Sequence, residues 1–282
     1  MFYLLNILIQ MKFLLNNTSL FKSLRPFNDI GFIPTMGGIH QGHLSLIKKS
    51  NKLCKKTIVS IFVNPKQFNN KKDLESYPQN IKKDLNILKK IKKIDFVYLP
   101  KIKDIYKDKN KPKIKMLKKD KILCAKFRTG HFEGVLNVMN RLMTIVKSKD
   151  LYMGEKDYQQ LYLIKKFLSK KFKVRINSCP TVRVNKNIAL STRNKLLKTN
   201  SLKKAAEIAL FLKKIKYKSK LHGPKLASNL SDYKKKLENK YNIKIDYLEF
   251  RDEKNLKLNN FKNNYRLFVA YNIDNVRLID NF

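Results

Sequence analysis

The sequence predicts an α/β fold in which a doubly wound parallel sheet is followed by a second, smaller α+β domain. Short apolar runs alternate with amphipathic helical patterns through residues 1–182, the order produced by right-handed strand–helix–strand units. The run 57–63 (TIVSIFV) lacks polar alternation, as expected of a strand buried on both faces of a parallel sheet. Beyond Thr181 two long helical patterns precede neighbouring strands. We therefore expect a larger domain at 1–182 and a smaller α+β domain at 183–282.

The elements expected in the larger domain follow from hydrophobic periodicity and from capping and breaking residues. In chain order they are a first strand within 1–15, a helix at 18–27 that is capped by Thr18 or Ser19 and ends before Pro26, a strand at 30–33, a helix at 42–55, a strand at 57–63, a turn and amphipathic helix at 73–92, a strand at 95–99, a lysine-rich irregular excursion with short strands at 101–126, a helix at 130–147, a strand at 151–153, a helix at 158–169 and a strand at 174–177. In the smaller domain we expect a helix at 205–215, a break at His222-Gly223-Pro224, a helix to 241, and strands at 243–250, 266–271 and 276–279.

The balance of charge is extreme, with Lys+Arg 63 against Asp+Glu 21 and a formal net charge of +42. By itself this balance points to nucleic acid or an anionic membrane as a partner. However, the lysines lie in nearly every segment, beside abundant Asn and Ile, as expected of AT-rich codons. A nucleic-acid site instead concentrates charge and aromatic rings on one face. We interpret the charge as compositional, with weak binding to polyanions as a side effect.

Three cysteines, Cys54, Cys124 and Cys179, are far apart and form no CxxC pair. Neither a disulfide framework nor a zinc site is indicated, and a reduced cytoplasmic setting fits best. The opening stretch MFYLLNILIQMKFLL is apolar, but polar residues interrupt it and no small-residue cleavage site follows, which favours a buried first strand over a signal peptide. Translation of the protein could begin at Met1 or at Met11. No stretch approaches the roughly 20 apolar residues that a membrane span needs.

The segment 31–43 (GFIPTMGGIHQGH) is an unusual passage from a strand into a helix. The backbone N–H groups near Gly42 and His43 are expected to be unpaired and to attract anions, above all phosphates. Ligands of doubly wound sheets bind beyond the carboxyl ends of the strands. Both this segment and 64–68 follow such strand ends, so we expect a phosphate-binding site there.

The two histidines of this segment, His40 and His43, form an HxGH pattern. An imidazole can donate a hydrogen bond to a triphosphate and stabilise the charge that develops during nucleotidyl transfer. Helix capping is the structural alternative for each ring. Metal binding is a third possibility, but no carboxylate or cysteine stands within a few residues to complete a ligand set.

Lys156 follows another strand end, that of the strand at 151–153, and further candidate groups lie in other short segments. Lys156 in 154–157 (GEKD), Arg193 in 190–193 (LSTR) and Arg128 with His131 in 127–132 (FRTGHF) supply cations suited to phosphate. The alternatives are a surface turn for Lys156 and a helix cap for Ser191. Two neutral hydrogen-bonding side chains, Gln67 and Gln160, suit a small substrate with hydroxyl and carboxylate groups, or are simply solvated. The residues show no nucleophilic serine elbow, Walker loop or paired metal carboxylates.

Together these motifs resemble the pantothenate synthetase (pantoate–β-alanine ligase) family of the HxGH nucleotidyltransferase superfamily. The resembling segments run in the family order: PTMGGIHQGHLSLI (34–47), VSIFVNPKQF with DLESYP (59–78), RTGHFEGV (128–135), LYMGEKDYQQL (151–161), PTVRVNKNIALSTRN (180–194) and VRLIDN (276–281). HxGH alone marks the wide superfamily, whereas NPxQF, GEKDxQQ and SxRN in this order are specific.

The resemblance implies a Rossmann-like first domain, a second domain covering the active site, and ATP-dependent condensation of (R)-pantoate with β-alanine through pantoyl adenylate, giving pantothenate, AMP and pyrophosphate. It implies ATP as co-substrate, Mg²⁺, and a homodimer. By motif position, ATP would contact Met36, Gly37, Gly38, Ile39, His40, Gln41, Gly42, His43, Gly154, Glu155, Lys156, Asp157, Val182, Leu190, Ser191, Thr192 and Arg193. Of these, His40, His43, Lys156 and Arg193 would be catalytic, with His43 in the family's proton-donor position. Gln67 would bind pantoate and β-alanine, Gln160 pantoate, Arg128 and His131 would lie near the substrates, and Asp84 would contact Mg²⁺.

Three residues depart from the family pattern. Thr129 stands where the family usually has Pro, Thr192 where it usually has Ser, and Asn187 where Gly is usual. Thr192 keeps its hydroxyl, and Asn tolerates left-handed backbone geometry better than most residues. We therefore expect an active enzyme with loosened turns. The competing hypotheses are another HxGH nucleotidyltransferase, a basic nucleic-acid-binding protein and an inactive homologue.

Overall fold

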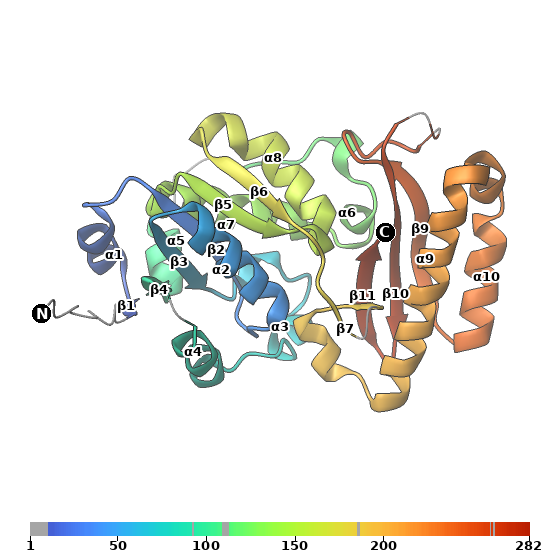
Figure 1. The fold of residues 1–282 in the computed structure, drawn as a ribbon, viewed down its shortest axis with the longest axis horizontal. Helices are drawn as coiled ribbons and strands as arrows, with labels where there is room; N and C mark the ends of the chain where they lie inside the picture. Colours follow the sequence, from blue (N-terminus) through green and yellow to red (C-terminus); the bar gives the residue numbers. More distant parts are fainter. Residues whose placement is uncertain (1–10, 92, 109–112, 185–186, 260, 262) are drawn as a thin grey trace, which may run out of the picture.

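The computed structural model describes residues 11–91, 93–108, 113–184, 187–259, 261 and 263–282. In this part of the chain a parallel sheet has the strand order β1-β4-β3-β2-β5-β6 (Figure 1). Its strands are β1 (Lys12–Leu14), β2 (Ile30–Thr35), β3 (Lys56–Ile61), β4 (Phe96–Tyr98), β5 (Asp150–Gly154) and β6 (Arg175–Cys179). The chain moves from β2 towards one edge and later returns to β5 on the other side of β2. The predicted doubly wound α/β fold is confirmed, and its switch point lies between β2 and β5.

Helices cover both faces of this sheet, as the unbroken apolar run of β3 predicts. Ile58 faces a core that includes Leu136 and Ile164 of the helices α7 and α8, whereas the next residue, Val59, faces Ile47 of α2. Successive side chains of a strand point to opposite faces, so a buried strand needs apolar residues at both. The covering helices are α1 (Asn17–Leu24), α2 (Gln41–Leu53), α4 (Ile81–Lys89), α7 (His131–Val146) and α8 (Tyr158–Phe172).

Two details of the larger unit differ from the sequence prediction. The cap of α1 is Asn16, whose side chain accepts from the Ser19 N–H, rather than Thr18 or Ser19. The excursion at 101–126 contains short helices and no strand in its described residues: α5 (Ile102–Tyr106), a 3₁₀ turn at Lys118–Asp120 and α6 (Cys124–Phe127). The part of the first strand predicted at 1–10 lies outside the described residues.

The C-terminal part is an antiparallel sheet packed against two helices. Strands β9 (Lys244–Asp252), β10 (Tyr265–Ile273) and β11 (Val276–Asn281) pair in the order β11-β10-β9. Helices α9 (Thr199–Ser228) and α10 (Leu230–Tyr241) run side by side along the outer face of this sheet (Figure 1). Within α9 the backbone leaves helical geometry at His222, two residues before Pro224, which confirms the predicted break. The smaller α+β unit is therefore present.

The two sheets share apolar contacts as well as having separate cores. One cluster joins α9 and α10 to the outer face of the second sheet, with Leu212 and Val269 fully buried. Tyr247 and Phe268 of the same sheet instead join the core of the first unit. A short hairpin, β7 (Arg183–Val184) with β8 (Ile188–Ala189), lies between the units in sequence. The proposed domain boundary at 182/183 stays a prediction.

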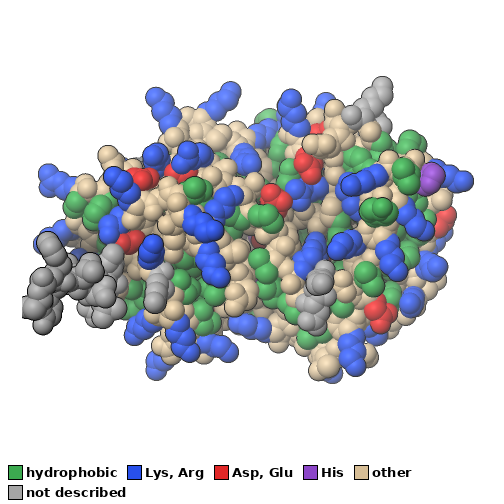
Figure 2. Space-filling model, viewed as in Figure 1, with side chains coloured by type: hydrophobic (Ala, Val, Ile, Leu, Met, Phe, Trp, Pro, Cys, Tyr) green, Lys and Arg blue, Asp and Glu red, His purple; other side chains and the backbone are tan. Residues whose placement is uncertain are grey.

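Basic side chains are distributed over the whole face that Figure 2 shows, with a few Asp and Glu side chains among them. Lys and Arg side chains are scattered over the elements of both units and do not gather in one patch on this face. Hydrophobic and uncharged groups separate them. None of the helices in the described residues combines the length and the apolar character that a transmembrane segment requires.

Candidate active site

A cavity of about 590 Å³ opens where the carboxyl ends of the parallel strands face the second sheet. Its wall includes Thr35 at the end of β2, Asn64 after β3 and Gly154 at the end of β5. Leu278 and Asp280 of β11 form part of the opposite wall. The cavity therefore lies at the switch point of the sheet, where ligands of doubly wound folds bind.

Most of the predicted site residues line this cavity together. Those on its wall are Met36, His40, Gly42, His43, Gln67, Arg128, His131, Gly154, Lys156, Asp157, Gln160, Val182, Leu190, Ser191, Thr192 and Arg193. Those not on its wall are Gly37, Gly38, Ile39, Gln41, Asp84 and Glu155. Gln41 is exposed, whereas the two glycines, Ile39 and Asp84 are buried behind the wall. The structure thus brings the cations, the histidines and the glutamines into one place.

The loop between β2 and α2 turns sharply through two glycines. Gly37 and Gly38 have φ values of 79° and 63°, a left-handed geometry that side chains disfavour. The loop is held on its inner side by Asp84, whose carboxylate oxygens accept from the Gly38 N–H and the Ile39 N–H, each at 2.8 Å. From the segment between β8 and α9, the Thr192 hydroxyl donates to the Gly38 carbonyl at 3.3 Å. The hydroxyl retained at Thr192 therefore contacts the loop.

His40 and His43 cap the start of α2 with one ring nitrogen each. Nδ1 of His40 accepts from the Gly42 N–H at 3.1 Å, and Nδ1 of His43 accepts from the His40 N–H at 3.4 Å. The prediction that the Gly42 N–H is unpaired was wrong, because the preceding imidazole satisfies it. His40 therefore caps the helix, which is the structural alternative considered for it. A neutral ring that accepts at Nδ1 carries its proton on Nε2. Capping thus leaves the Nε2–H group able to donate to a ligand.

Burial keeps both rings neutral near pH 7. It lowers the pKa of His40 to about 4, with a contribution from the positive charge of Lys156, and it lowers the pKa of His43 to about 3, with a contribution from His40. The ring centroids are 4.2 Å apart, so protonating one ring disfavours protonating the other. The arrangement provides two adjacent N–H donors that carry no net charge.

His131 links two other parts of the wall. Its Nδ1 lies 2.6 Å from the carbonyl oxygen of Gln67, which is an acceptor, so Nδ1 carries the proton and donates. Nε2 is then the acceptor for Nη1 of Arg128 at 3.1 Å. Burial, followed by the charge of Arg128, lowers the pKa of His131 to about 3. The neutral ring thus orients both the backbone that carries Gln67 and the Arg128 guanidinium.

Asp73 joins Arg128 to the second arginine of the site. Its two oxygens accept from Nη2 of Arg128 at 3.2 Å and from Nη2 of Arg193 at 3.3 Å. The Arg193 guanidinium also lies 5.6 Å from the centre of the Tyr77 ring. The carboxylate thus bridges two cations that otherwise repel each other.

Sequence reasoning assigned no role to Asp73, Tyr77 or Asn64, all of which line the cavity. Asn64 donates to Gln67 Oε1 at 3.2 Å and accepts from Tyr106, so it orients the Gln67 side chain. The segment DLESYP, which contains Asp73 and Tyr77, could have pointed to these two residues. It served only to support the family resemblance.

The remaining predicted groups have partial partners. Lys156 lies 3.2 Å from Asp157, and its side chain is 17% exposed, so it faces the cavity rather than open solvent. Glu155 pairs with Arg266 at 3.0 Å and points away from the cavity wall. Ser191 accepts from the Arg193 N–H at 3.3 Å, which is the capping alternative considered for it.

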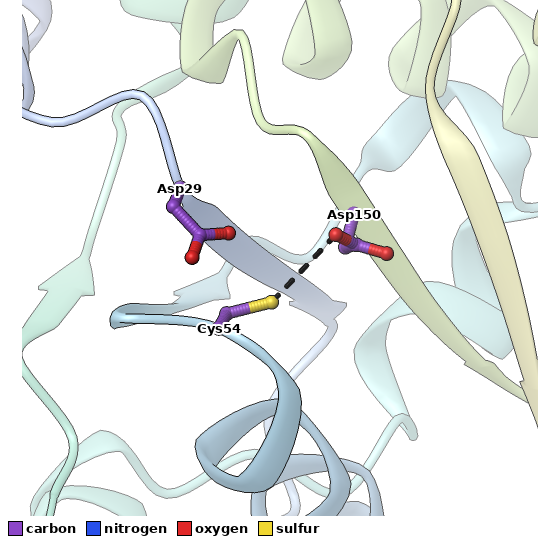
Figure 3. A group of neighbouring side chains, drawn as sticks. All are labelled: Asp29, Cys54 and Asp150. Carbon is purple, nitrogen blue, oxygen red and sulfur yellow. Dashed lines mark hydrogen bonds between the residues drawn. The ribbon is translucent and has the colours of Figure 1, made fainter.

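A group of three potential metal ligands lies at the amino ends of the parallel strands, whereas the cavity lies at their carboxyl ends. Asp29, Cys54 and Asp150 lie together at the amino ends of β2 and β5, and Figure 3 shows the Cys54 thiol directed at the Asp150 carboxylate. Asp150 accepts from Arg175 at 2.9 Å and from Asn177 at 2.7 Å. Its negative charge is thus already balanced by a guanidinium, and the group is remote from the cavity that holds the histidines.

Comparisons with known proteins cover almost the whole chain. The family model described as Pantoate-beta-alanine ligase matches residues 12–282. A pantothenate synthetase of Flavobacterium psychrophilum is 38% identical over 270 residues, covering 92% of this chain and 94% of that protein. One from Francisella tularensis subsp. novicida is 41% identical over 269 residues, covering 94% of this chain and 93% of that protein.

Solved structures agree with these relatives. The pantoate-beta-alanine ligase of Francisella tularensis, solved in complex with β-γ ATP and β-alanine, superposes with a TM-score of 0.82 at 39% identity and covers 96% of this chain and 97% of that one. The pantothenate synthetase of Thermus thermophilus superposes with a TM-score of 0.88 at 28% identity and covers 96% and 99%. The chain belongs to the pantoate-beta-alanine ligase family.

Proposed function

We propose that this protein condenses (R)-pantoate with β-alanine at the expense of ATP, giving pantothenate, AMP and pyrophosphate. One observation carries the assignment. His40 and His43 turn Nδ1 to the backbone and hold their protons on Nε2 in a cavity that they share with Lys156, Arg193 and two glutamines. Neutral and cationic donors gathered beside polar amides suit a triphosphate and a small hydroxy acid better than either ligand alone.

The reaction has two displacements. The pantoate carboxylate attacks the α-phosphorus of ATP, the bond to the bridging oxygen breaks, and pyrophosphate leaves with the electron pair. The β-alanine amine then attacks the acyl carbon of the adenylate, the bond to the AMP oxygen breaks, and the amine loses a proton. Both steps depend on positioning and on stabilising oxygens that gain charge.

We assign the donors around the phosphates by their place on the wall. The Nε2–H groups of His40 and His43 stabilise charge on the phosphates, and His43 is the donor to the reacting phosphate. Lys156 and Arg193 neutralise the triphosphate, and Ser191, Thr192, Leu190 and Val182 line the nucleotide. Arginine suits this task because its forked N–H groups match phosphate oxygens.

The substrate part of the cavity lies by Gln67 and Gln160. We propose that Gln67 binds pantoate and β-alanine and that Gln160 binds pantoate. Met36 Sδ accepts from Gln67 Nε2, and Asn64 donates to Gln67 Oε1, so the amide has a defined orientation. Val138, Met139 and Leu142 form an apolar wall nearby, which suits the methyl groups of pantoate.

A dependence on Mg²⁺ stays a prediction, and the carboxylates near the cavity do not fit a dedicated metal site. Asp73 binds two arginines, Asp84 binds two backbone N–H groups, and Asp157 lies beside Lys156. A divalent ion prefers free oxygen ligands. We therefore expect Mg²⁺ to arrive on the phosphates of ATP, and we assign no step to a metal bound by the protein.

The assignment is tested by incubating the protein with ATP, Mg²⁺, D-pantoate and β-alanine and measuring AMP. We expect release of AMP to require both organic substrates. We also expect exchange of labelled pyrophosphate into ATP to require pantoate alone, because the adenylate forms before β-alanine reacts. AMP release that is independent of pantoate, or that occurs with another acid alone, contradicts the proposal and favours a different HxGH nucleotidyltransferase.

Two further expectations belong to the same proposal. A homodimer is expected from the family resemblance and is measured by light scattering coupled to size exclusion. A cytoplasmic location is expected because Cys54, Cys124 and Cys179 are free thiols in the structure. It is tested by fractionating the source cells.

A further inference from the structure

Asp84 occupies an unusual place behind the loop that carries the histidines. It lies in the first turn of α4, and only 2% of its surface is exposed. Its Oδ2 accepts from the Gly38 N–H and its Oδ1 from the Ile39 N–H, each at 2.8 Å. The preceding N–H, that of Gly37, donates to the Thr35 hydroxyl at 3.2 Å. Three successive backbone donors of the loop are thus directed inward.

Such a row of backbone N–H groups is normally a binding site for an anion. Here the anion is supplied by the protein, since the Asp84 carboxylate takes the Gly38 and Ile39 donors. Neither these two residues nor Asp84 lies on the cavity wall. A phosphate in the cavity is therefore bound by side chains and not by the amides of the glycine turn.

The same contacts disagree with a metal role for Asp84. A carboxylate that binds Mg²⁺ needs an oxygen facing the phosphates, whereas both oxygens of Asp84 face backbone donors on the inner side of the loop. Gly38 is held from both sides, because its carbonyl also accepts from the Thr192 hydroxyl. The loop is therefore held between α4 and the turn that carries Thr192.

We propose that Asp84 is a positioning residue of the adenylation site, which acts as a built-in anion that fixes the Gly37–Ile39 turn and thereby sets the places of His40 and His43. The inference rests on the proposed function and deepens it. His40 directly follows the clamped Ile39, and its ring must meet the Gly42 N–H to present Nε2 to the cavity. Without the carboxylate, the two N–H groups lose their buried acceptor and the turn must rearrange to satisfy them.

The test compares the full-length protein with Asp84→Asn, which keeps the size of the side chain but opposes one backbone N–H with an NH₂ group. We expect kcat for adenylate formation to fall by about 10–10²-fold, because misplacing a catalytic group by about 1 Å has an effect of this size. The KM for β-alanine and the Mg²⁺ concentration at half-maximal rate are expected to stay unchanged. A raised Mg²⁺ requirement, with rate restored by excess Mg²⁺, overturns the proposal in favour of a metal ligand.

A second readout does not depend on activity. The chain has only four histidines, so their ring signals can be followed by NMR. We expect Asp84→Asn to move the signals of His40 and His43 while those of His131 and His222 stay in place. A variant with lowered thermal stability but unchanged His40 and His43 signals overturns the proposal, because Asp84 then has a merely structural role.

Two variants complete the design. Asp104→Asn is the matched control, since Asp104 also accepts a backbone N–H, that of Lys101 at 2.8 Å, but this N–H does not belong to the loop that carries the histidines. It is expected to keep wild-type kcat. If Asp84→Asn does not fold, Asp84→Glu keeps the carboxylate but displaces its oxygens from the Gly38 and Ile39 N–H groups, and unchanged His40 and His43 signals in it overturn the proposal. If the wild-type protein forms no pantoate-dependent AMP, the proposed function fails, while the NMR comparison still decides the role of Asp84.

Discussion

At the scale of single residues, each histidine of the cavity uses its two ring nitrogens for different tasks. In His40 and His43, Nδ1 accepts from the backbone and Nε2 keeps the proton. In His131 the order is reversed, because Nδ1 donates to the carbonyl of Gln67 and Nε2 accepts from Arg128. The first pair is therefore built to donate into the cavity, whereas the third ring orients its neighbours.

We expect His43→Ala to lower kcat by about 10²–10³-fold, the usual loss when one donor to a developing charge is removed. The fold should persist, since the ring contributes one long hydrogen bond, at 3.4 Å, to the start of α2. Steady-state rates of AMP release measure the effect. His222→Ala, at the exposed kink of α9, is the matched control and keeps the wild-type rate. If the His43→Ala protein is fully active, His43 serves only to cap the start of α2.

Acid is expected to destabilise the protein through the same rings. Burial lowers the pKa values of His40 to about 4 and of His43 and His131 to about 3, whereas a histidine in the unfolded chain has its ordinary value of 6.5. Between these limits the unfolded chain binds more protons, so the free energy of unfolding falls as the pH drops from 6.5 towards 4. Denaturant titrations at several pH values measure the slope.

His131→Asn removes one of the three titrating rings and thereby measures how much His131 contributes to the pH dependence of stability. We expect its free energy of unfolding to depend less steeply on pH than that of the wild type over the same window. An equal slope in both proteins shows that the charged form of His131 is as stable in the folded state as in the unfolded one.

The sequence identified the groups whose chemistry is visible in a short motif. His40, His43, Lys156 and Arg193 were recognised because each lies in a short characteristic segment, and the first three also follow predicted strand ends. Asp73 was missed because its role depends on partners 55 and 120 residues away, which no local pattern reveals. The occupancy of the Gly38 and Ile39 N–H groups was missed for the same reason, since Asp84 reaches them across 46 and 45 residues.

At the scale of elements, the strongest periodic patterns were predicted well and the short ones were not. Strand β3 and helix α7 contain enough apolar residues for their buried faces to be recognised from the sequence pattern alone. The cap of α1 was misplaced because Asn16, Thr18 and Ser19 are all good caps, and in the structure the Asn16 side chain forms a capping box with Ser19. The short helices within 101–126 have too few turns to be stable alone, so tertiary packing decides them.

Helix α7 positions Gln67 through close backbone packing at Gly134. A Cβ at this position overlaps the carbonyl oxygen of Lys66 and lies 2.7 Å from the Cα of Gln67. We expect Gly134→Ala to destabilise the protein by about 1–3 kcal/mol, the usual range for overpacking, and to raise the KM for pantoate because the Gln67 segment must move. Thermal unfolding and initial rates with varied pantoate measure both effects.

Thr144→Ala provides the comparison, because Thr144 lies on the exposed side of the same helix. It is expected to change neither the stability by more than about 0.5 kcal/mol nor the KM for pantoate. If Gly134→Ala keeps the wild-type KM while losing stability, the packing of α7 supports the fold without setting the place of Gln67.

At the scale of the whole molecule, only a few of the many positively charged side chains line the cavity. Lys156, Arg128 and Arg193 line it, and carboxylates contact all three. The other cations are spread over both units, as Figure 2 shows for one face. A charge of +42 attracts polyanions at long range regardless of its arrangement, but spread charge provides no sequence-specific contact.

We therefore expect this protein to bind RNA and DNA weakly, without sequence preference, and with an affinity that falls steeply with salt. Fluorescence polarisation with labelled oligonucleotides of unrelated sequence, at about 50 and about 200 mM salt, measures this directly. Because each phosphate contact releases condensed counterions, the logarithm of the binding constant should decline linearly with the logarithm of the salt concentration. Nucleic acid should not compete with ATP at the higher salt concentration, since the cavity is lined by both units and admits a nucleotide rather than a duplex. Tight binding of one sequence at physiological salt, or inhibition of AMP release by it, contradicts this expectation and supports the nucleic-acid-binding hypothesis.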